Sequence, residues 1–230
     1  MADQPDSRPV FTIVMGCNGS GKSAWKRANY DRLPDRYFDQ DSIAGGIGDW
    51  DSEDARQRTR VYVDAEVGAT MRERLSFGIE STYSGRPGRE MVERMRAADY
   101  RIEGIYLGTE SPEINVARIE RRVLERTGHR VDPARVPERY RYSLSNLRRT
   151  VEHFDQLEVL DNSRSDALGM PQPIEQCFLE RGQVVSRLPA NEMAAWSAAW
   201  LRGVEQARAE KQRLAERRQR REAQERGRGR

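Results

Sequence analysis

Residues 16–23, GCNGSGKS, match the pattern G-x-x-x-x-G-K-[ST] at every required position. They follow an apolar run and precede a predicted helix, which is the context this pattern needs. Glycines in such a loop let backbone N–H groups surround phosphates, and the helix N-terminus adds positive potential. We expect Lys22 to bridge the β- and γ-phosphates of ATP and Ser23 to coordinate Mg²⁺. The remaining predicted ATP-binding residues are Gly16, Asn18, Gly19, Ser20 and Gly21. The alternative is a glycine-rich turn without a ligand.

Two aspartates, Asp39 and Asp41, lie at the end of a short predicted strand, residues 36–39. The carboxyl ends of strands line the ligand crevice in a doubly wound sheet. A carboxylate at that position can take the proton from a substrate hydroxyl during phosphoryl transfer. Asp41 is the preferred catalytic base and Asp39 the second candidate. Either residue could instead cap the helix that begins near Ser42.

Glu80 and Thr82 end the next predicted strand, residues 77–82, and by the same reasoning should face the substrate. Glu80 could bind a sugar hydroxyl or hold Mg²⁺ through water, and Thr82 could donate to the substrate. A solvated turn is the alternative for both residues. Further along, Asp161-Asn162-Ser163 could contact the base or ribose of the nucleotide, or form an Asx-turn.

Arginines are numerous in residues 112–150, which read as helix, loop and helix. Cationic donors near a transferred phosphoryl group lower the barrier, and a segment in this position could close as a lid. Arg126 and Arg139 flank the hinge from Gly128 to Pro133 and are the predicted catalytic pair. The chain has 37 arginines and three lysines, so most arginines must simply be solvated. His129 in the hinge is expected to pack or hydrogen-bond rather than catalyse.

Strands alternate with helices along the chain, which predicts an α/β fold with a parallel sheet covered on both faces. We expect strands at residues 10–15, 36–39, 77–82, 101–107 and 157–161. Helices are expected at residues 22–30, 53–75, 88–98, 112–126 and 133–151, and a hairpin at 177–188 should turn at Arg181-Gly182. The sequence thus predicts a three-layer P-loop kinase fold over residues 10–190. It has a helical lid at about 112–150 and a disordered N-terminus at 1–9.

The C-terminal part is predicted to begin with a docking helix, residues 191–204, capped by Asn191. Its apolar side chains are spaced to form one face, with Met193, Trp196, Trp200 and Val204. Residues 205–230 are expected to form a charged basic tail, with ten basic residues against five acidic ones. The whole chain carries only +3, so the body is slightly acidic. A solvated helix is the preferred interpretation of the tail, and a nucleic-acid tether is the alternative.

Composition excludes several classes of protein. The chain has 230 residues, of which 37% are hydrophobic and 33% charged, so a packed core beneath a charged surface is possible. No apolar run approaches the ~18 residues that span a bilayer, and the N-terminal residues lack a signal-peptide pattern. Cys17 and Cys177 do not suggest a disulfide framework or a structural zinc site. We therefore expect a cytoplasmic protein without a membrane partner.

The motifs GCNGSGKS, FDQDSIA, IESTYSG, RTGHRVDPARVPERYRYSLSNL and LDNS occur in this order. With them the chain resembles the zeta toxin family, and more closely its compact bacterial branch of predicted ATPases or kinases. The resemblance covers residues 10–165. It implies a P-loop kinase that uses ATP and Mg²⁺ to phosphorylate UDP-N-acetylglucosamine at the 3′-hydroxyl of its sugar, and an antitoxin that blocks the nucleotide site.

Carried over by position, the resemblance implies Lys22 and Ser23 for ATP and Mg²⁺ and Asp41 as the base. It places Glu80 and Thr82 on the substrate side, and Arg126 and Arg139 as charge-stabilising arginines. The chain departs from the branch at Thr127, usually glycine, and at Cys17, commonly proline. The sequence therefore predicts an ATP-dependent phosphotransferase acting on a nucleotide sugar or a related small molecule. The alternative is a P-loop ATPase that acts on a partner or nucleic acid through the basic tail.

Overall fold

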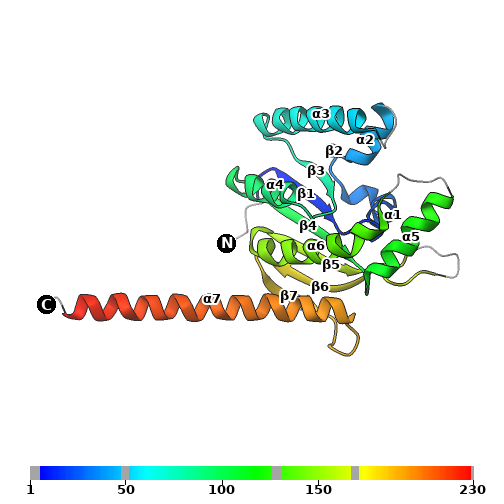
Figure 1. The fold of residues 1–230 in the computed structure, drawn as a ribbon. Coiled ribbons are helices and arrows are strands. Elements are labelled where there is room, and N and C mark those ends of the chain that lie inside the picture. The colour runs from blue at the N-terminus through cyan, green and yellow to red at the C-terminus, as the bar shows by residue number, and fades with distance from the viewer. Residues whose placement is uncertain (1–5, 48–51, 126–130, 167–170, 229–230) are drawn as a thin grey trace.

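The computed structural model describes residues 6–47, 52–125, 131–166 and 171–228 (Figure 1). Within them a seven-stranded sheet has the order β2-β3-β1-β4-β5-β6-β7. Its first five strands are parallel, and β6 and β7 add an antiparallel edge. The strands are β1 Val10–Met15, β2 Tyr37–Phe38, β3 Phe77–Ser81, β4 Arg101–Gly108, β5 Gln156–Asp161, β6 Ile174–Glu180 and β7 Gln183–Arg187. The predicted α/β class and parallel sheet are confirmed.

Helices cover both faces of this sheet. They are α1 Lys22–Ala28, α2 Gln40–Ile47, α3 Glu53–Arg72, α4 Arg86–Ala97, α5 Pro112–Leu124, α6 Val136–Thr150 and α7 Ala195–Arg228, with short 3-10 turns at Tyr30–Arg32, Pro133–Arg135 and Val151–His153. The larger apolar cluster joins one face of β1 and β4 to α4, α6 and the start of α7, for example through Phe11, Met95 and Leu147. A smaller cluster packs Trp25 of α1 against Val14 and Leu107 on the other face. The arrangement is the three-layer fold expected from the sequence.

Local sequence explains where several elements begin and turn. Ser52 caps α3, because its side chain accepts from the Ala55 N–H at 3.1 Å. The β6–β7 hairpin turns at Arg181 and Gly182, as predicted, with both residues at positive φ (49° and 74°). Two successive positive φ values are typical of the type I′ turn that joins twisted antiparallel strands.

The segment predicted as a lid, residues 112–150, divides into two parts of different character. In α6 the side chains of Val136, Ser143, Leu147 and Thr150 are buried, so this helix is part of the core. In α5 the buried residues are Asn115 and Ile119. The hinge residues 126–130, which include Arg126 and His129, lie outside the described part of the chain. The second half of the segment therefore packs one face against the core, and closure of residues 112–150 as a lid stays a prediction.

The C-terminal helix differs from the prediction at both ends. Asn191 does not cap it, because α7 begins at Ala195. The cap comes from β6 instead: Gln176 Oε1 accepts from the Ala194 N–H at 2.7 Å and from Ser197 Oγ at 2.9 Å. Trp196, Trp200 and Val204 are buried, as the apolar spacing predicts. Beyond them, α7 continues without a break as one 34-residue helix that projects from the body (Figure 1). Residues 205–228 contain no proline, and good helix formers predominate.

Residues 6–9 contact the body of the protein. This differs from the prediction that residues 1–9 are disordered. The Arg8 guanidinium binds both Asp6 and the buried Asp155, and Pro9 O accepts from the Arg101 N–H at 3.0 Å. The Pro9 contact continues the pairing of β1 with β4, which lies in the middle of the sheet. Cys17 and Cys177 are buried and unpaired. None of the helices in the described ranges is both long enough and apolar enough to span a membrane.

Candidate nucleotide-binding and active site

The loop at residues 16–21 connects β1 to α1, as the motif requires. Gly19 and Gly21 have φ of 78° and 97°, in the region that side chains disfavour. Space is also lacking at both glycines. A Cβ atom at Gly19 would lie 2.4 Å from the backbone oxygen of Asn115, and one at Gly21 would lie 2.0 Å from Asn162 Nδ2. Both positions therefore require glycine.

The inner side of the loop carries hydrogen-bond donors without protein acceptors. The N–H groups of Gly19, Gly21, Lys22 and Ser23 make no hydrogen bond to any residue in the described ranges. Ser20 Oγ is buried and likewise has no partner there. Gly19, Gly21 and Ser23 are half-buried, and the first N–H groups of a helix have no intrahelical acceptor, so these donors are available to a ligand rich in acceptor oxygens. A chain of phosphates fits this requirement.

Lys22 is held across the loop. Its side chain is only 7% exposed, and its Nζ donates to Gly16 O at 2.8 Å and to Cys17 O at 3.3 Å. The same Nζ lies 3.8 Å from Glu80 Oε1, at the end of the neighbouring strand β3. Lys22 and Glu80, predicted separately for ATP and for substrate, are thus brought together in one site.

Lys26, one helical turn beyond Lys22, lies between two acidic side chains, Asp39 and Glu80. Its Nζ contacts Asp39 Oδ2 and lies 3.6 Å from Glu80 Oε2. Burial opposes ionisation of Asp39, but the hydrogen bond and charge of Lys26 keep the pKa of that carboxyl below its usual value. Asp39 also caps α2, since its carboxylate accepts from the Ser42 N–H at 3.3 Å and from Ser42 Oγ at 2.9 Å. Asp39 is therefore the capping residue of the two aspartates.

The other predicted site residues have different outcomes. Asp41 lies in the first turn of α2, directly after β2, and its side chain is outside the described part of the structure. Thr82 follows β3, with its Oγ1 3.1 Å from Ser84 Oγ and its carbonyl accepting from Ser143 Oγ at 2.9 Å. Ser23 is the second residue of α1. The positions of Asp41, Thr82 and Ser23 at strand and helix ends agree with their predicted roles, which remain predictions.

Arg139 of α6 reaches the phosphate-binding loop. Its Nη1 donates to Asn18 Oδ1 at 2.9 Å. A guanidinium in this position can interact with anionic oxygens bound by the loop, because it presents several N–H donors in a fixed plane. Arg139 is thus brought to the loop, as predicted, whereas Arg126 lies outside the described residues.

Two buried asparagines support the loop, and neither of these contacts was predicted; Asn162 was expected to face the nucleotide or to belong to an Asx-turn. Asn115 Nδ2 donates to Asn18 O at 2.9 Å, and Asn162 Nδ2 donates to Ser20 O at 2.7 Å. Asn115 is fully buried and Asn162 is 1% exposed. The sequence held one signal for Asn115: it lies four residues before Ile119, on the apolar face of α5, where a polar side chain requires a hydrogen-bond partner.

The turn after β5 is an Asx-turn, one of the two alternatives that the sequence left open. Asp161 accepts from the Ser163 N–H at 3.4 Å and from Ser163 Oγ at 2.6 Å. Asp161 Oδ1 also accepts from Trp196 Nε1 of α7 at 2.7 Å. A cavity of about 610 Å³, lined in part by Glu110, Asp161 and Ser163, adjoins this turn. Contact of the turn with a nucleotide base or ribose remains a prediction.

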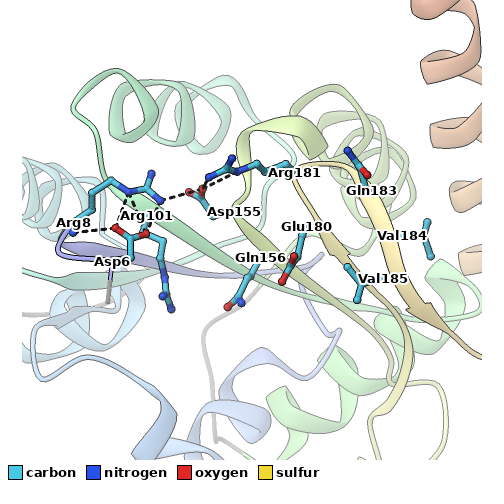
Figure 2. Close-up of a pocket in the computed structure, with 10 residues that line it drawn as sticks. All are labelled: Asp6, Arg8, Arg101, Asp155, Gln156, Glu180, Arg181, Gln183, Val184 and Val185. Atoms are coloured by element: carbon cyan, nitrogen blue, oxygen red, sulfur yellow. Dashed lines mark hydrogen bonds and ion pairs between the residues drawn. The ribbon is translucent and has the colours of Figure 1, made fainter. Parts of the chain in front are cut away.

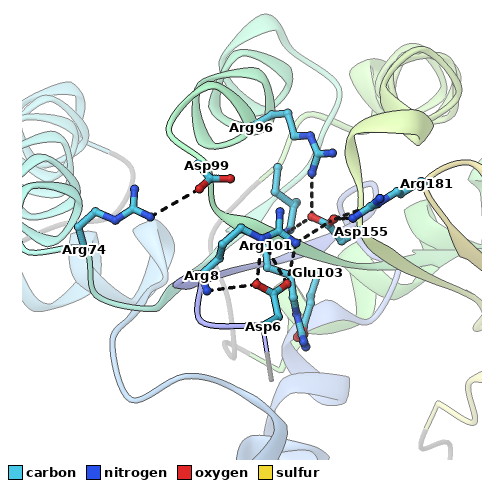
Figure 3. A network of polar contacts seen from close by, with 10 residues as sticks. Asp6, Arg8, Arg74, Arg96, Asp99, Arg101, Glu103, Asp155 and Arg181 are labelled. Carbon is cyan, nitrogen blue, oxygen red and sulfur yellow. Dashed lines mark hydrogen bonds and ion pairs between the residues drawn. The ribbon is translucent and has the colours of Figure 1, made fainter. Parts of the chain in front are cut away.

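At the amino ends of the strands, opposite the phosphate-binding loop, a separate pocket of about 440 Å³ lies beside a network of ion pairs (Figures 2 and 3). At the centre of the ion-pair network, the buried Asp155 carboxylate accepts from Arg96 at 2.9 Å and from Arg8 and Arg181 at 3.3 Å. Arg101 begins β4 and Asp155 precedes β5, so the cluster lies at the amino ends of the strands. The phosphate-binding loop lies at the carboxyl end of β1. The ion-pair network is therefore not part of the candidate site.

The fold and the loop together define a P-loop nucleotide-binding protein of the α/β class. At the level of sequence, the chain matches no family model and no curated protein. Among solved structures it is similar to a chain of the AvrRxo1-ORF1:-ORF2 complex with ATP, with a TM-score of 0.63 and 9% identity. The match covers 84% of this chain and 64% of that chain, so this chain spans less than two thirds of the AvrRxo1 length.

A second similar structure belongs to the PezAT chromosomal toxin–antitoxin system of Streptococcus pneumoniae. Its TM-score is 0.54 at 15% identity, and the match covers 94% of this chain and 89% of that chain. At these identities the likeness establishes the fold alone. This chain therefore shares its three-layer fold with a chain of a complex that holds ATP and with a chain of a toxin–antitoxin system.

Proposed function

We propose that this chain is an ATP-dependent phosphotransferase of the zeta toxin type. Its acceptor would be a hydroxyl of a nucleotide sugar such as UDP-N-acetylglucosamine, or of a related small molecule. The observation that carries the proposal is the loop at residues 16–23, with its unpaired N–H groups, buried Ser20 Oγ and nearly buried Lys22. Glu80 beside Lys22 and Arg139 at Asn18 add the acidic and cationic groups that a kinase requires.

ATP would be held by the loop N–H groups and Lys22, and Arg139 would offset charge on the transferred phosphoryl group. Asp41 would accept the proton of the acceptor hydroxyl. The acceptor oxygen then bonds to the γ-phosphorus, the bond from that phosphorus to the bridging oxygen breaks, and ADP leaves. Glu80 and Thr82 would orient the acceptor. Hydroxyl and carboxylate oxygens at the site are ligands that suit Mg²⁺, which Ser23 would hold to neutralise phosphate charge.

The central experiment compares wild type with Asp41→Asn, using γ-labelled ATP, Mg²⁺ and a panel of nucleotide sugars. We expect labelled acceptor only with wild type, and unchanged ATP affinity in the variant, because the base acts in transfer and not in nucleotide binding. Asp39→Asn is the comparison variant for the second candidate base: Asp39 caps α2 and pairs with Lys26, so we expect this variant to retain transfer, and loss of transfer in Asp39→Asn alone would move the role to Asp39. Equal transfer by wild type and Asp41→Asn would remove Asp41 from its role.

A protein antitoxin is the proposed macromolecular partner. The fold is shared with a chain of a chromosomal toxin–antitoxin system, and the site at the carboxyl ends of the strands would be the surface to block. A partner that lowers ATP binding when present in equal amount, measured by competition, would support this proposal. Undiminished ATP binding in the complex would contradict it.

The second candidate function, an ATPase that acts on nucleic acid, rests on the projecting part of α7. Among the described residues, Lys211 is the last in the chain to form an ion pair with the body, with its Nζ 2.7 Å from Glu152 Oε2. Beyond it, Arg213, Arg217 and Arg220 are exposed and follow i, i+4, i+7 spacing, so they share one helix face. None of the three forms an ion pair with a residue of the described ranges. Such a row of cations suits the phosphates of nucleic acid.

This candidate is separated from the kinase by two measurements. Replacing Arg213, Arg217 and Arg220 by glutamine should weaken binding of a duplex DNA or RNA probe, and wild-type binding should fall steeply between about 50 and 200 mM salt. Glutamine at the exposed Arg56, Arg58 and Arg60 of α3 is the matched control. ATP hydrolysis stimulated by the probe would favour the ATPase. No probe binding by wild type at low salt would exclude it.

A further inference from the structure

The phosphate-binding loop is shaped by two buried side chains outside the motif. Asn115 of α5 donates from Nδ2 to the carbonyl of Asn18 at 2.9 Å, and Asn162, after β5, donates to the carbonyl of Ser20 at 2.7 Å. The two asparagines belong to different elements of the fold and are 0% and 1% exposed. Each therefore makes its hydrogen bond without competition from water.

The geometry of the peptide unit turns these two bonds into control of two N–H groups. In a trans peptide the carbonyl of one residue and the N–H of the next lie in one plane and point in opposite directions. When Asn115 holds the Asn18 carbonyl outward, the N–H of Gly19 must point inward. In the same way, the bond from Asn162 to the Ser20 carbonyl turns the N–H of Gly21 inward. These two N–H groups are among those without an acceptor in the described chain.

Both asparagines are themselves fixed in place. Asn115 Oδ1 accepts from Thr109 Oγ1 at 2.5 Å, and the Asn162 backbone N–H donates to Gly108 O at 2.8 Å. They also pack directly on the loop, because a Cβ atom at Gly19 or Gly21 would meet Asn115 or Asn162 at 2.4 Å or less. Rotation of either loop peptide would leave a buried carbonyl and a buried amide unpaired, which is costly.

We propose that Asn115 and Asn162 are positioning residues that set the Gly19 and Gly21 N–H groups to receive phosphate oxygens. This inference rests on the proposed function in one respect, which is that the ligand of the loop is a triphosphate. Preorganised N–H donors bind anionic oxygens without a cost of reorganisation, so loss of either asparagine should weaken phosphate binding. The base and sugar of the nucleotide play no part in this effect.

The test uses the full chain with Asn115→Leu and Asn162→Leu, which keep the side-chain shape and remove the donor without adding charge. Asn146→Leu is the matched control, because buried Asn146 of α6 donates to the Tyr83 carbonyl at 3.0 Å, away from the loop. Binding of ATP and of inorganic tripolyphosphate is measured by calorimetry, and stability by urea unfolding. If a leucine variant does not fold, Asn115→Ser and Asn162→Ser replace it.

We expect the Asn115 and Asn162 variants to bind ATP and tripolyphosphate about tenfold or more weakly, by the same factor for both ligands. Asn146→Leu should lose similar stability and keep both affinities. Unchanged affinity in the loop variants, or an equal loss in Asn146→Leu, would overturn the positioning role alone. Wild type that binds neither ligand would overturn both this inference and the proposed function. Wild type that binds both ligands but transfers no phosphate would overturn only the proposed kinase.

Discussion

The guanidinium of Arg139 donates to the side-chain oxygen of Asn18 at 2.9 Å and so joins α6 to the phosphate-binding loop. Because α6 is packed into the core through Leu147 and Val136, the position of Arg139 is set by a rigid element. In this position the guanidinium lies beside the loop that is predicted to hold the phosphates. This relationship supports a direct role for Arg139 in phosphoryl transfer.

Replacing Arg139 tests that role. On the proposed function, Arg139→Ala should lower kcat roughly hundredfold, because a preorganised donor to the developing charge is lost. Arg139→Lys should recover little of it, since an ammonium lacks the planar set of donors. Rates are measured with saturating ATP and acceptor. Arg141→Ala, an exposed arginine two residues further on the same helix, is the control and should retain its rate. Normal turnover by Arg139→Ala would assign the arginine to loop support only.

Lys26→Met should destabilise the fold in a pH-dependent way. The ammonium holds the pKa of Asp39 below its usual value despite burial, and it also lies 3.6 Å from Glu80. Because the folded-state pKa is depressed, this stabilisation is present above the unfolded value near 4 and is lost as the pH falls through the folded one. The difference in unfolding free energy between wild type and variant should thus be about 2 kcal/mol from pH 7 down to about pH 4 and should shrink at lower pH. Urea unfolding at several pH values measures it.

Lys26→Arg is the control for this experiment, since it keeps the positive charge and should stay close to wild type at every pH. A difference between wild type and Lys26→Met that stays constant below about pH 4 would indicate that the lysine contributes through packing, for example over the Tyr37 ring, 5.4 Å away.

Asp155→Asn should also destabilise the protein without affecting nucleotide binding. Burial opposes ionisation of Asp155, but the Ile102 N–H and the charges of Arg96 and Arg8 hold its pKa below the usual value (Figure 3). The loss should be about 2 kcal/mol at pH 7 and should shrink below about pH 4, where protonation removes the wild-type advantage. Chemical unfolding across this pH range checks the prediction.

Asp99→Asn provides the matched comparison, because Asp99 is 73% exposed and its oxygen lies 4.0 Å from Arg74. Exposed pairs of this kind contribute little, so we expect a change within about 0.5 kcal/mol. If both variants lose the same free energy of unfolding, the ion pairs around Asp155 stabilise the fold no more than an exposed pair does. A weaker ATP affinity in Asp155→Asn would show that the ion-pair network at the amino ends of the strands influences nucleotide binding at their carboxyl ends.

The sequence predicted the features that depend on neighbouring residues. The apolar run of β1, the phosphate-binding motif and the turn at Arg181 and Gly182 all have local signatures, and the structure agrees with each. Features that depend on distant residues were missed. Asn115 and Asn162 contact the loop across separations of 97 and 142 residues, and Gln176 displaces Asn191 as the cap of α7. Lys26 could have been recognised, because it lies four residues after Lys22 on the same helix face.

The two tryptophans of α7 offer a comparison within a single helix. Both are nearly buried, at 7% and 6% exposure, but Trp196 Nε1 donates to the buried Asp161 at 2.7 Å, whereas Trp200 Nε1 has no partner in the described ranges. Trp196→Phe removes a hydrogen bond to a carboxylate, and Trp200→Phe removes none. We therefore expect Trp196→Phe to cost about 1.5–3 kcal/mol more unfolding free energy than Trp200→Phe, measured in urea. Because Asn162 follows Asp161, Trp196→Phe should also weaken ATP binding. Equal stability of the two variants would mean that the hydroxyl of Ser163 alone satisfies Asp161.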